Sequence, residues 1–178
     1  MRGLRARQSI LLPPPVVGAL WVPLTQSKFA LVDEQDRWVL GYPWHYKECR
    51  NCEYAARRED GHSLYLHRQI LGLTPADSFE VDHRDGDGLN NRRTNLRLAS
   101  HQQNLQNQRP RGGSSPFRGV CWDESRKKWI VTVRFGARRE YLGRFNSEHK
   151  AALAYNLRAR ELFGEFARLN PVDNGEHS

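Results

Sequence analysis

The sequence predicts an α+β protein with two small domains, of which the second is a three-stranded antiparallel sheet packed on one helix. Short β-prone runs separated by turn residues fill the first half of the chain. The second half has three longer alternating runs followed by one amphipathic helical pattern. Between them lies a segment rich in Gly, Ser, Pro and Arg, which is typical of a flexible linker. A chain of 178 residues is long enough for two such domains.

The predicted domain boundaries follow these changes in composition. Prolines without a sustained hydrophobic period predict a poorly ordered N-terminal extension over residues 1–27. We expect a strand-and-loop domain over 28–108, a basic linker over 109–114, a sheet-and-helix domain over 115–170 and a tail over 171–178.

In the first domain, four short runs are rich in β-prone residues. They are Phe29–Val32, Trp38–Leu40, Cys52–Ala55 and Ser63–Leu66. A brief helix is expected over His67–Leu71, ended by Gly72. Glu80 and Val81 then predict a short strand that leads directly into Asp82 and His83.

In the second domain, three antiparallel strands and one helix are expected. The strands are Phe117–Trp122, Lys128–Phe135 and Arg138–Phe145, and the helix is Glu148–Phe163. Ser147 is placed to cap the start of this helix, and Gly164 to end it. The alternation in the second strand puts Trp129 and Val131 on the face toward the helix and Arg134 on the other.

The charge balance indicates a polyanionic partner. Lys and Arg number 28 against 20 Asp and Glu, giving a formal net charge of +8. Three cysteines are too few for a disulfide framework and favour a reducing, cytoplasmic setting over secretion. An N-terminal run that imitates a signal peptide is interrupted at Pro13, and no apolar stretch reaches the ~20 residues of a membrane span.

The segment from Val81 to Asn104 is the most informative in the chain. A strand delivers Asp82 and His83, a loop rich in Gly, Asp and Asn follows, and Asn95 opens a returning strand. Ser100 and Gln103 form a capping-box pattern at the start of a helix that carries Asn104. A hairpin packed on such a helix can bring an acid, an imidazole and two amides into one cleft.

This pattern, Asp-His followed by Asn-Asn-x-x-x-Asn-Leu and a later Asn, resembles the HNH nucleases of the homing and phage type. The resemblance implies a ββα-metal fold in which His83 is the general base and Asn95 orients its imidazole. It also implies one divalent ion, Mg²⁺ or alternatively Mn²⁺, held by Asp82 and Asn104. The family pattern often has histidine at the position of Asn104, and His101 is the alternative ligand here.

Other polar residues of the first domain have simpler interpretations. Asp85 and Asp87 are expected to stabilise the loop rather than bind metal, because a calcium-loop spacing is missing. His67 is interpreted as structural or phosphate-adjacent. We interpret Cys49-x-x-Cys52 as two thiols in a hairpin turn. The alternative is a zinc site completed by His45 and His62, although their spacing matches no known zinc module.

The segment Ser115–Asn170 resembles the apetala-two (ethylene-response-factor-type) DNA-binding domains. Its matching runs include Ser115–Trp122, Tyr141–Phe145 and Phe163–Asn170. The resemblance implies a sheet that enters the DNA major groove. The expected DNA-contacting residues of this domain and of the linker are Arg118, Lys128, Arg134, Arg139, Tyr141, Arg109 and Arg111. Cys121 and Thr132 replace base-reading residues of the plant proteins, so a different target sequence is implied.

Together these features predict a metal-dependent endonuclease that acts on double-stranded DNA, with no small-molecule substrate. The resemblance implies 5′-phosphate and 3′-hydroxyl products, and the chain is expected to be monomeric. The alternative is a non-catalytic DNA-binding protein whose first domain is a structural module.

Overall fold

Two hydrophobic cores organise the chain, one within residues 1–98 and one within residues 99–178. The computed structural model describes residues 12–49, 52–106 and 113–172. Several small antiparallel sheets and few helices make this a mixed α and β protein. The predicted α+β class is confirmed to this extent. Arg109 and Arg111 of the predicted linker lie outside the described residues, as do residues 173–178 of the predicted tail.

The first sheet lies partly in the stretch that was expected to lack regular structure. β1 (Ala19–Pro23) pairs antiparallel with β2 (Phe29–Asp33), and the 3₁₀ helix η1 (Thr25–Ser27) closes the hairpin. Val22 and Leu24 are buried in the core of the first unit. A short apolar alternation next to several prolines is a weak sequence signal for a strand. Pairing with β2 stabilises β1 here.

The run Trp38–Leu40 belongs to a 3₁₀ helix, so the predicted strand there is wrong. The helix η2 (Glu34–Gly41) buries Asp36 and Val39 and leaves Trp38 and Leu40 exposed. The Asp36 carboxylate accepts hydrogen bonds from Nε and Nη2 of Arg93, at 2.9 and 2.8 Å. This ion pair joins positions far apart in the sequence, and local β propensity carries no information about it.

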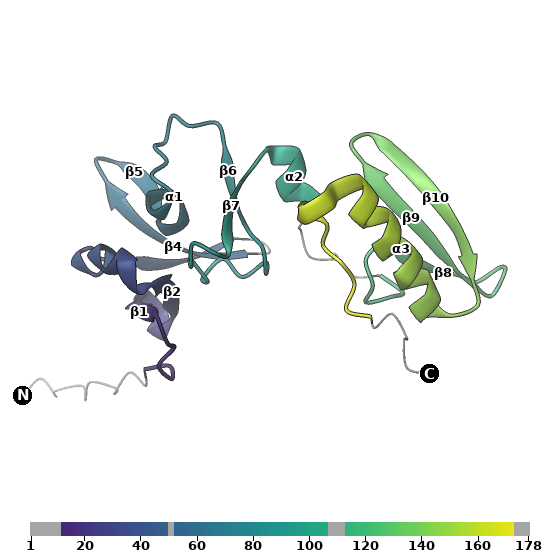
Figure 1. The fold of residues 1–178 in the computed structure, drawn as a ribbon, viewed down its shortest axis with the longest axis horizontal. Helices are drawn as coiled ribbons and strands as arrows, with labels where there is room; N and C mark the ends of the chain where they lie inside the picture. The colour runs from purple at the N-terminus through teal and green to yellow at the C-terminus, as the bar shows by residue number, and fades with distance from the viewer. Residues whose placement is uncertain (1–11, 50–51, 107–112, 173–178) are drawn as a thin grey trace, which may run out of the picture. The chain divides into compact units, whose positions relative to one another are not determined.

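A second, three-stranded antiparallel sheet has the order β3-β4-β5, formed by β3 (His45–Cys49), β4 (Cys52–Glu59) and β5 (His62–Tyr65). The helix α1 (Leu66–Ile70) follows and packs against β4 and β5, burying Leu66 and Ile70 (Figure 1). The brief helix predicted from the sequence is therefore confirmed, with Gly72 just beyond its end at φ 72°.

The segment with the Asp-His pattern folds as a two-stranded sheet of β6 (Glu80–His83) and β7 (Leu96–Ala99). The helix α2 (His101–Gln106) comes next in the chain. The predicted capping box is confirmed, because Ser100 N donates to Gln103 Oε1 at 2.8 Å and Gln103 N donates to Ser100 Oγ at 3.3 Å. The boundary between the two units falls within β7, so α2 belongs to the second unit.

The second unit contains a three-stranded antiparallel sheet, in the order β10-β9-β8, covered by one helix (Figure 1). The strands are β8 (Val120–Asp123), β9 (Lys128–Phe135) and β10 (Arg138–Phe145), and the helix is α3 (Glu148–Phe163), followed by the 3₁₀ turn η3 (Gly164–Phe166). The Ser147 cap is confirmed, since its side chain accepts a hydrogen bond from Lys150 N. Val131 and Val133 meet Ala152 and Tyr155 in the core.

Across residues 12–49, 52–106 and 113–172, none of the helices has both the length and the apolar composition that a membrane crossing requires.

Candidate active site and nucleic-acid interface

β6 carries the acid and the imidazole that the sequence identifies. Asp82 and His83 are both buried, with 4% and 6% of their surfaces exposed. Successive side chains of a strand point to opposite faces, so the two groups have different surroundings. Asp82 contacts Arg97 of β7, whereas His83 contacts the loop between the strands and a cluster of aromatic rings.

Arg97 forms a buried ion pair with Asp82. Its Nε and Nη2 lie 2.7 and 2.6 Å from the same carboxylate oxygen, Oδ2 of Asp82. The two side chains are only 7% and 4% exposed, so water screens the interaction little. The negative charge of Asp82 is therefore compensated within the protein. Arg97 could not be predicted as the partner of Asp82 from the sequence, because an arginine in a short strand is usually a solvent-facing residue.

Asn91 is the amide that lies against the imidazole. Its Oδ1 is 3.5 Å from Nε2 of His83, and the side chain is fully buried. Its Nδ2 donates to the carbonyl of Leu89 at 3.0 Å, and its backbone N donates to the carbonyl of Leu31 at 2.7 Å. The loop is thus fixed to β2, and Asn91 is held in place from both sides.

The electrostatic surroundings keep the imidazole uncharged near neutral pH. Burial lowers the pKa of His83 below its ordinary value, because a charged ring would lose its hydration. The hydrogen bond with Asn91 and the negative charges of Asp85 and Asp82 raise this pKa part of the way back. An uncharged imidazole is the form that can accept a proton.

Asn95 organises the loop in which Asp85 lies. Its Nδ2 donates to Asp85 Oδ1 at 3.0 Å and to the Asn90 carbonyl at 2.7 Å, and its Oδ1 accepts from Asp85 N at 3.1 Å. Asp85 Oδ1 also accepts from Asp87 N at 2.8 Å, and Asp87 Oδ1 accepts from Leu89 N at 3.0 Å. Both carboxylates thus bond to the backbone of their own loop, as turn-stabilising residues do.

A cluster of rings from three elements packs around His83. The centroid of the His67 ring lies 5.1 Å from that of His83, and the Tyr54 centroid lies 6.0 Å away. Tyr65 stacks on His67 at 5.5 Å. Burial, with smaller contributions from His83 and Arg68, lowers the pKa of His67 to about 3, so this second imidazole is neutral. Its Nδ1 is buried without a hydrogen-bond partner.

Gly88 allows the loop to approach β4 closely. A Cβ at this position would lie 2.0 Å from the Glu53 carbonyl oxygen and 2.8 Å from the Tyr54 ring. Any larger residue would therefore push the loop, and with it Asn91, away from the ring cluster.

Asp82 is the buried carboxylate that would contribute to a divalent-metal site in this segment. Among residues 12–49, 52–106 and 113–172, no three His, Cys, Asp or Glu side chains gather closely enough to form a metal site. Asp82 offers one buried carboxylate, and Mg²⁺ characteristically combines one or two carboxylates with waters and substrate phosphates. Asn104 and His101 lie on α2 in the second unit, whereas Asp82 lies in the first.

Cys49 and Cys52 are register partners at the end of the β3–β4 hairpin and are both free thiols. Burial and the neighbouring Cys52 raise the pKa of the Cys49 thiol above its usual range. Among residues 12–49, 52–106 and 113–172, no group of three or more His, Cys, Asp or Glu side chains that could hold a metal ion includes these two thiols.

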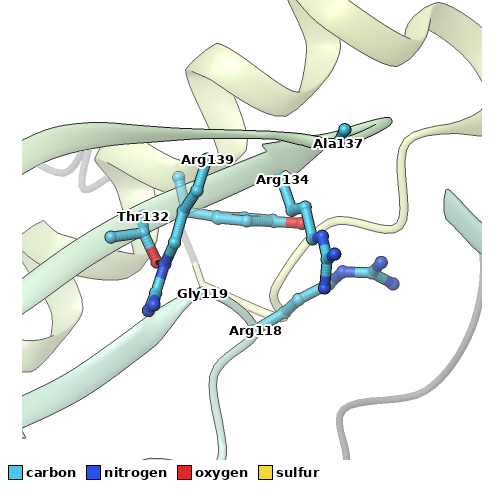
Figure 2. A pocket seen from close by; sticks show the side chains of 7 residues that line it. Arg118, Gly119, Thr132, Arg134, Ala137 and Arg139 are labelled. Atoms are coloured by element: carbon cyan, nitrogen blue, oxygen red, sulfur yellow. Dashed lines mark hydrogen bonds between the residues drawn. The ribbon is translucent and has the colours of Figure 1, made fainter.

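In the second unit, three of the expected DNA-contacting arginines line one pocket of about 450 Å³. Figure 2 shows the guanidinium groups of Arg118, Arg134 and Arg139 around this pocket, with Thr132 beside Arg139. Arg134 and Arg139 are register partners on adjacent strands and are both exposed. Like charges directly opposite one another are unfavourable in a sheet, so a bound anion would stabilise this arrangement.

Two further expected contacts, Tyr141 and Lys128, lie on the same three-stranded sheet. Tyr141, which is 51% exposed, is the register partner of Thr132, and the Arg144 guanidinium lies 5.3 Å from its ring centroid. Lys128 donates a hydrogen bond to Asn146 at the end of the sheet.

A glycine and an asparagine fix the position of Arg118. A Cβ at Gly119, where φ is 75°, would lie 2.3 Å from the Tyr155 ring. Arg118 N donates to Asn170 Oδ1 at 2.6 Å, and Asn170 Nδ2 donates back to the Arg118 carbonyl at 3.1 Å.

The chain is similar in sequence to HNH endonucleases. The family model described as HNH endonuclease matches residues 66–106, which include α1, β6, β7 and α2. An uncharacterized HNH endonuclease, L560 of Acanthamoeba polyphaga mimivirus, is 36% identical over 151 residues, covering 83% of this chain and 78% of the relative. The chain belongs to the HNH endonuclease family.

Two further relatives match shorter stretches of this HNH endonuclease chain. Protein 3.8 of Escherichia phage T7 is 34% identical over 91 residues, covering 51% of the chain and 74% of that protein. Dehydration-responsive element-binding protein 2C of Arabidopsis thaliana is 40% identical over 66 residues, which is 34% of the chain and 18% of the plant protein. No solved structure gives a significant match.

Proposed function

We propose that this HNH-family chain is a metal-dependent DNA endonuclease that hydrolyses phosphodiester bonds and leaves 5′-phosphate and 3′-hydroxyl ends. The observation that supports this most directly is the buried Asp82–His83 pair on β6, with Asn91 against the imidazole, inside the segment matched by the family model. A phosphodiester needs a base for the attacking water and a cation for the charge that develops.

His83 is the proposed general base. Its ring is neutral, and Asn91 on one side and the His67 ring on the other restrict its orientation. We assign the orienting role to Asn91 in addition to Asn95, whose hydrogen bonds support the loop rather than reaching directly to the ring. A preoriented imidazole can take the proton of water without rearranging at the moment of reaction.

Asp82 and Asn104 are the proposed ligands of one divalent ion, Mg²⁺ or Mn²⁺. When bound, this ion would stabilise the charge on the phosphate and on the leaving 3′ oxygen. Asp82 contributes the charged oxygen and Asn104 a neutral one, a hard donor set that suits magnesium.

The sheet of the second unit is the proposed grip on double-stranded DNA. Arg118, Arg134 and Arg139 present positive charge at one pocket, and exposed Tyr141 lies two register pairs further along β10. The similarity to a plant protein named as an element-binding protein supports an apetala-two-like role for this half. We include Lys128 and the linker residues Arg109 and Arg111 in this surface, and we propose that the enzyme acts as a monomer in the cytoplasm of a bacterium or an infected host.

A plasmid-nicking assay with the full chain, in Mg²⁺ and in excess EDTA, tests the proposal. We expect nicked or linear plasmid only with the metal. DNA binding with no cleavage in Mg²⁺ or Mn²⁺ would instead favour the alternative, a DNA-binding protein with a structural HNH module.

A further inference from the structure

The buried ion pair between Arg97 and Asp82 is unusual for a carboxylate that is proposed to hold a metal ion. Nε and Nη2 of Arg97 lie 2.7 and 2.6 Å from Oδ2 of Asp82, and neither side chain is more than 7% exposed. Elsewhere in the unit, Arg93 pairs with Asp36 and Arg92 with Asp33, but those guanidinium groups are 43% and 35% exposed. Arg97 therefore compensates the charge of Asp82 in a place that water hardly reaches.

This arrangement has a consequence for any divalent cation at Asp82. A cation that approaches the carboxylate also meets the positive charge of Arg97, and burial strengthens that repulsion. The single negative charge of one carboxylate is too small to neutralise both a divalent ion and a guanidinium group. The negative oxygens of a DNA phosphate supply the missing charge, and they are also the ligands with which Mg²⁺ usually completes its coordination.

We propose that Arg97 makes metal binding by this chain conditional on DNA. In the free protein Arg97 holds and neutralises Asp82, so that metal affinity is weak. With a phosphate in place, the summed negative charge accommodates the metal and Arg97 together. Arg97 is thus a positioning residue that acts through Asp82. The inference rests on the proposed function, which makes Asp82 a metal ligand.

Direct Mn²⁺ binding to the full chain, measured by electron paramagnetic resonance, tests this without any cleavage reaction. In the absence of DNA, Arg97→Gln should bind Mn²⁺ at least about tenfold more tightly than the wild type, because a buried positive charge next to the ion is removed. Arg97→Lys keeps that charge and should bind Mn²⁺ as weakly as the wild type. Equal affinities for the wild type and Arg97→Gln, or tight binding by Arg97→Lys, would overturn the proposal.

Coupling to DNA provides the second measurement, in a His83→Ala background that prevents cutting. A short duplex should tighten Mn²⁺ binding by the Arg97-containing protein more than by its Arg97→Gln counterpart, since the phosphate replaces charge that Arg97 had cancelled. The same enhancement by the duplex in both proteins would contradict the proposed coupling.

Stability gives a matched control, because Arg97→Gln leaves Asp82 buried without its partner. We expect a fall in Tm of roughly 10 °C in EDTA, and recovery of most of it in Mn²⁺. Arg93→Gln likewise removes the arginine that pairs with the buried Asp36 carboxylate. This variant should lose stability, and Mn²⁺ should not restore it. If Arg97→Gln is unfolded in EDTA, Mn²⁺ should restore its circular dichroism, and failure to do so counts against the proposal.

These readouts separate the inference from the proposed function. A chain that does not nick DNA, yet binds Mn²⁺ more tightly after Arg97→Gln, would keep the role of Arg97 and lose the nuclease assignment. A chain that nicks DNA, with Mn²⁺ binding unaffected by Arg97→Gln, would keep the nuclease and lose the role of Arg97.

Discussion

The loop segment of the first unit and the sheet of the second unit handle charge in opposite ways. In the first, Asp82 and Arg97 form an ion pair that lies almost entirely out of solvent, and the exposed Asp85 is hydrogen-bonded to buried Asn95. In the second, Arg134 and Arg139 are exposed and are register partners on the adjacent strands β9 and β10. Groups that are already paired are preorganised for chemistry, whereas exposed charges of one sign favour a partner that brings the other. We therefore expect substitutions in the first unit to change the nicking rate and the metal response, and substitutions in the second unit to change DNA affinity and its salt dependence.

The largest effect is expected from His83→Ala, which removes the proposed base from the first unit. The nicking rate should fall by ~10²–10⁴-fold, while affinity for duplex DNA stays close to that of the wild type. Rates from single-turnover nicking and affinities from gel shift check this. His62→Ala, an exposed histidine of β5, is the matched control and should keep full activity. A wild-type rate for His83→Ala would remove the imidazole from the mechanism.

Asp82→Asn and Asn104→Ala are expected to change the metal response and to leave the affinity for DNA measured in EDTA unchanged. Each weakens the oxygen donors available to the ion, so the metal concentration for half-maximal nicking should rise by roughly tenfold or more. A Mg²⁺ titration of nicking measures it. His101→Ala distinguishes the alternative ligand on α2, and a larger shift for His101→Ala than for Asn104→Ala would exchange their roles.

The second unit should show the reverse pattern. Arg134→Ala combined with Arg139→Ala should weaken DNA binding and leave the metal concentration for half-maximal nicking unchanged. If each arginine contacts a phosphate, the slope of log affinity against log salt should become shallower by about 0.9 per residue. Arg158→Ala is the control, because Arg158 lies on α3 and pairs with Glu140. An unchanged salt slope in the double variant would move the DNA grip away from this pocket.

The two units also differ in how much of them the sequence predicts. In the second, β9, β10 and α3 match the predicted bounds, because each has a strong period and α3 has local caps. In the first, Asp82 and His83 were placed correctly on a strand, but Arg97 and Asn91 were not identified as their neighbours. Of the adjacent residues Asn90 and Asn91, it is Asn91 that lies against the imidazole. This choice depends on the long-range hydrogen bond that anchors the loop to Leu31 of β2. Sequence periodicity does not contain such information.

The smallest effect concerns His67, the buried neutral imidazole behind His83, and its sign follows from its pKa. The folded pKa is about 3 against about 6.5 in an unfolded chain, so the unfolded state binds a proton first as pH falls. Stability from this group is complete above pH 6.5 and declines by up to about 1.4 kcal/mol per pH unit between 6.5 and 3.

His67→Phe keeps a ring in the cluster and removes both the titration and the buried Nδ1 that has no partner. The variant should be at least as stable as the wild type at neutral pH, because an unsatisfied buried polar atom is lost. At pH 5.5 the stability difference should shift in favour of the variant by about 1 kcal/mol. Urea unfolding of the full chain at both pH values measures this, with exposed His62→Gln as the control that should show no such shift. A parallel pH dependence in His67→Phe and the wild type would mean that His67 is protonated in the folded protein, and the neutral ring cluster behind His83 would have to be abandoned.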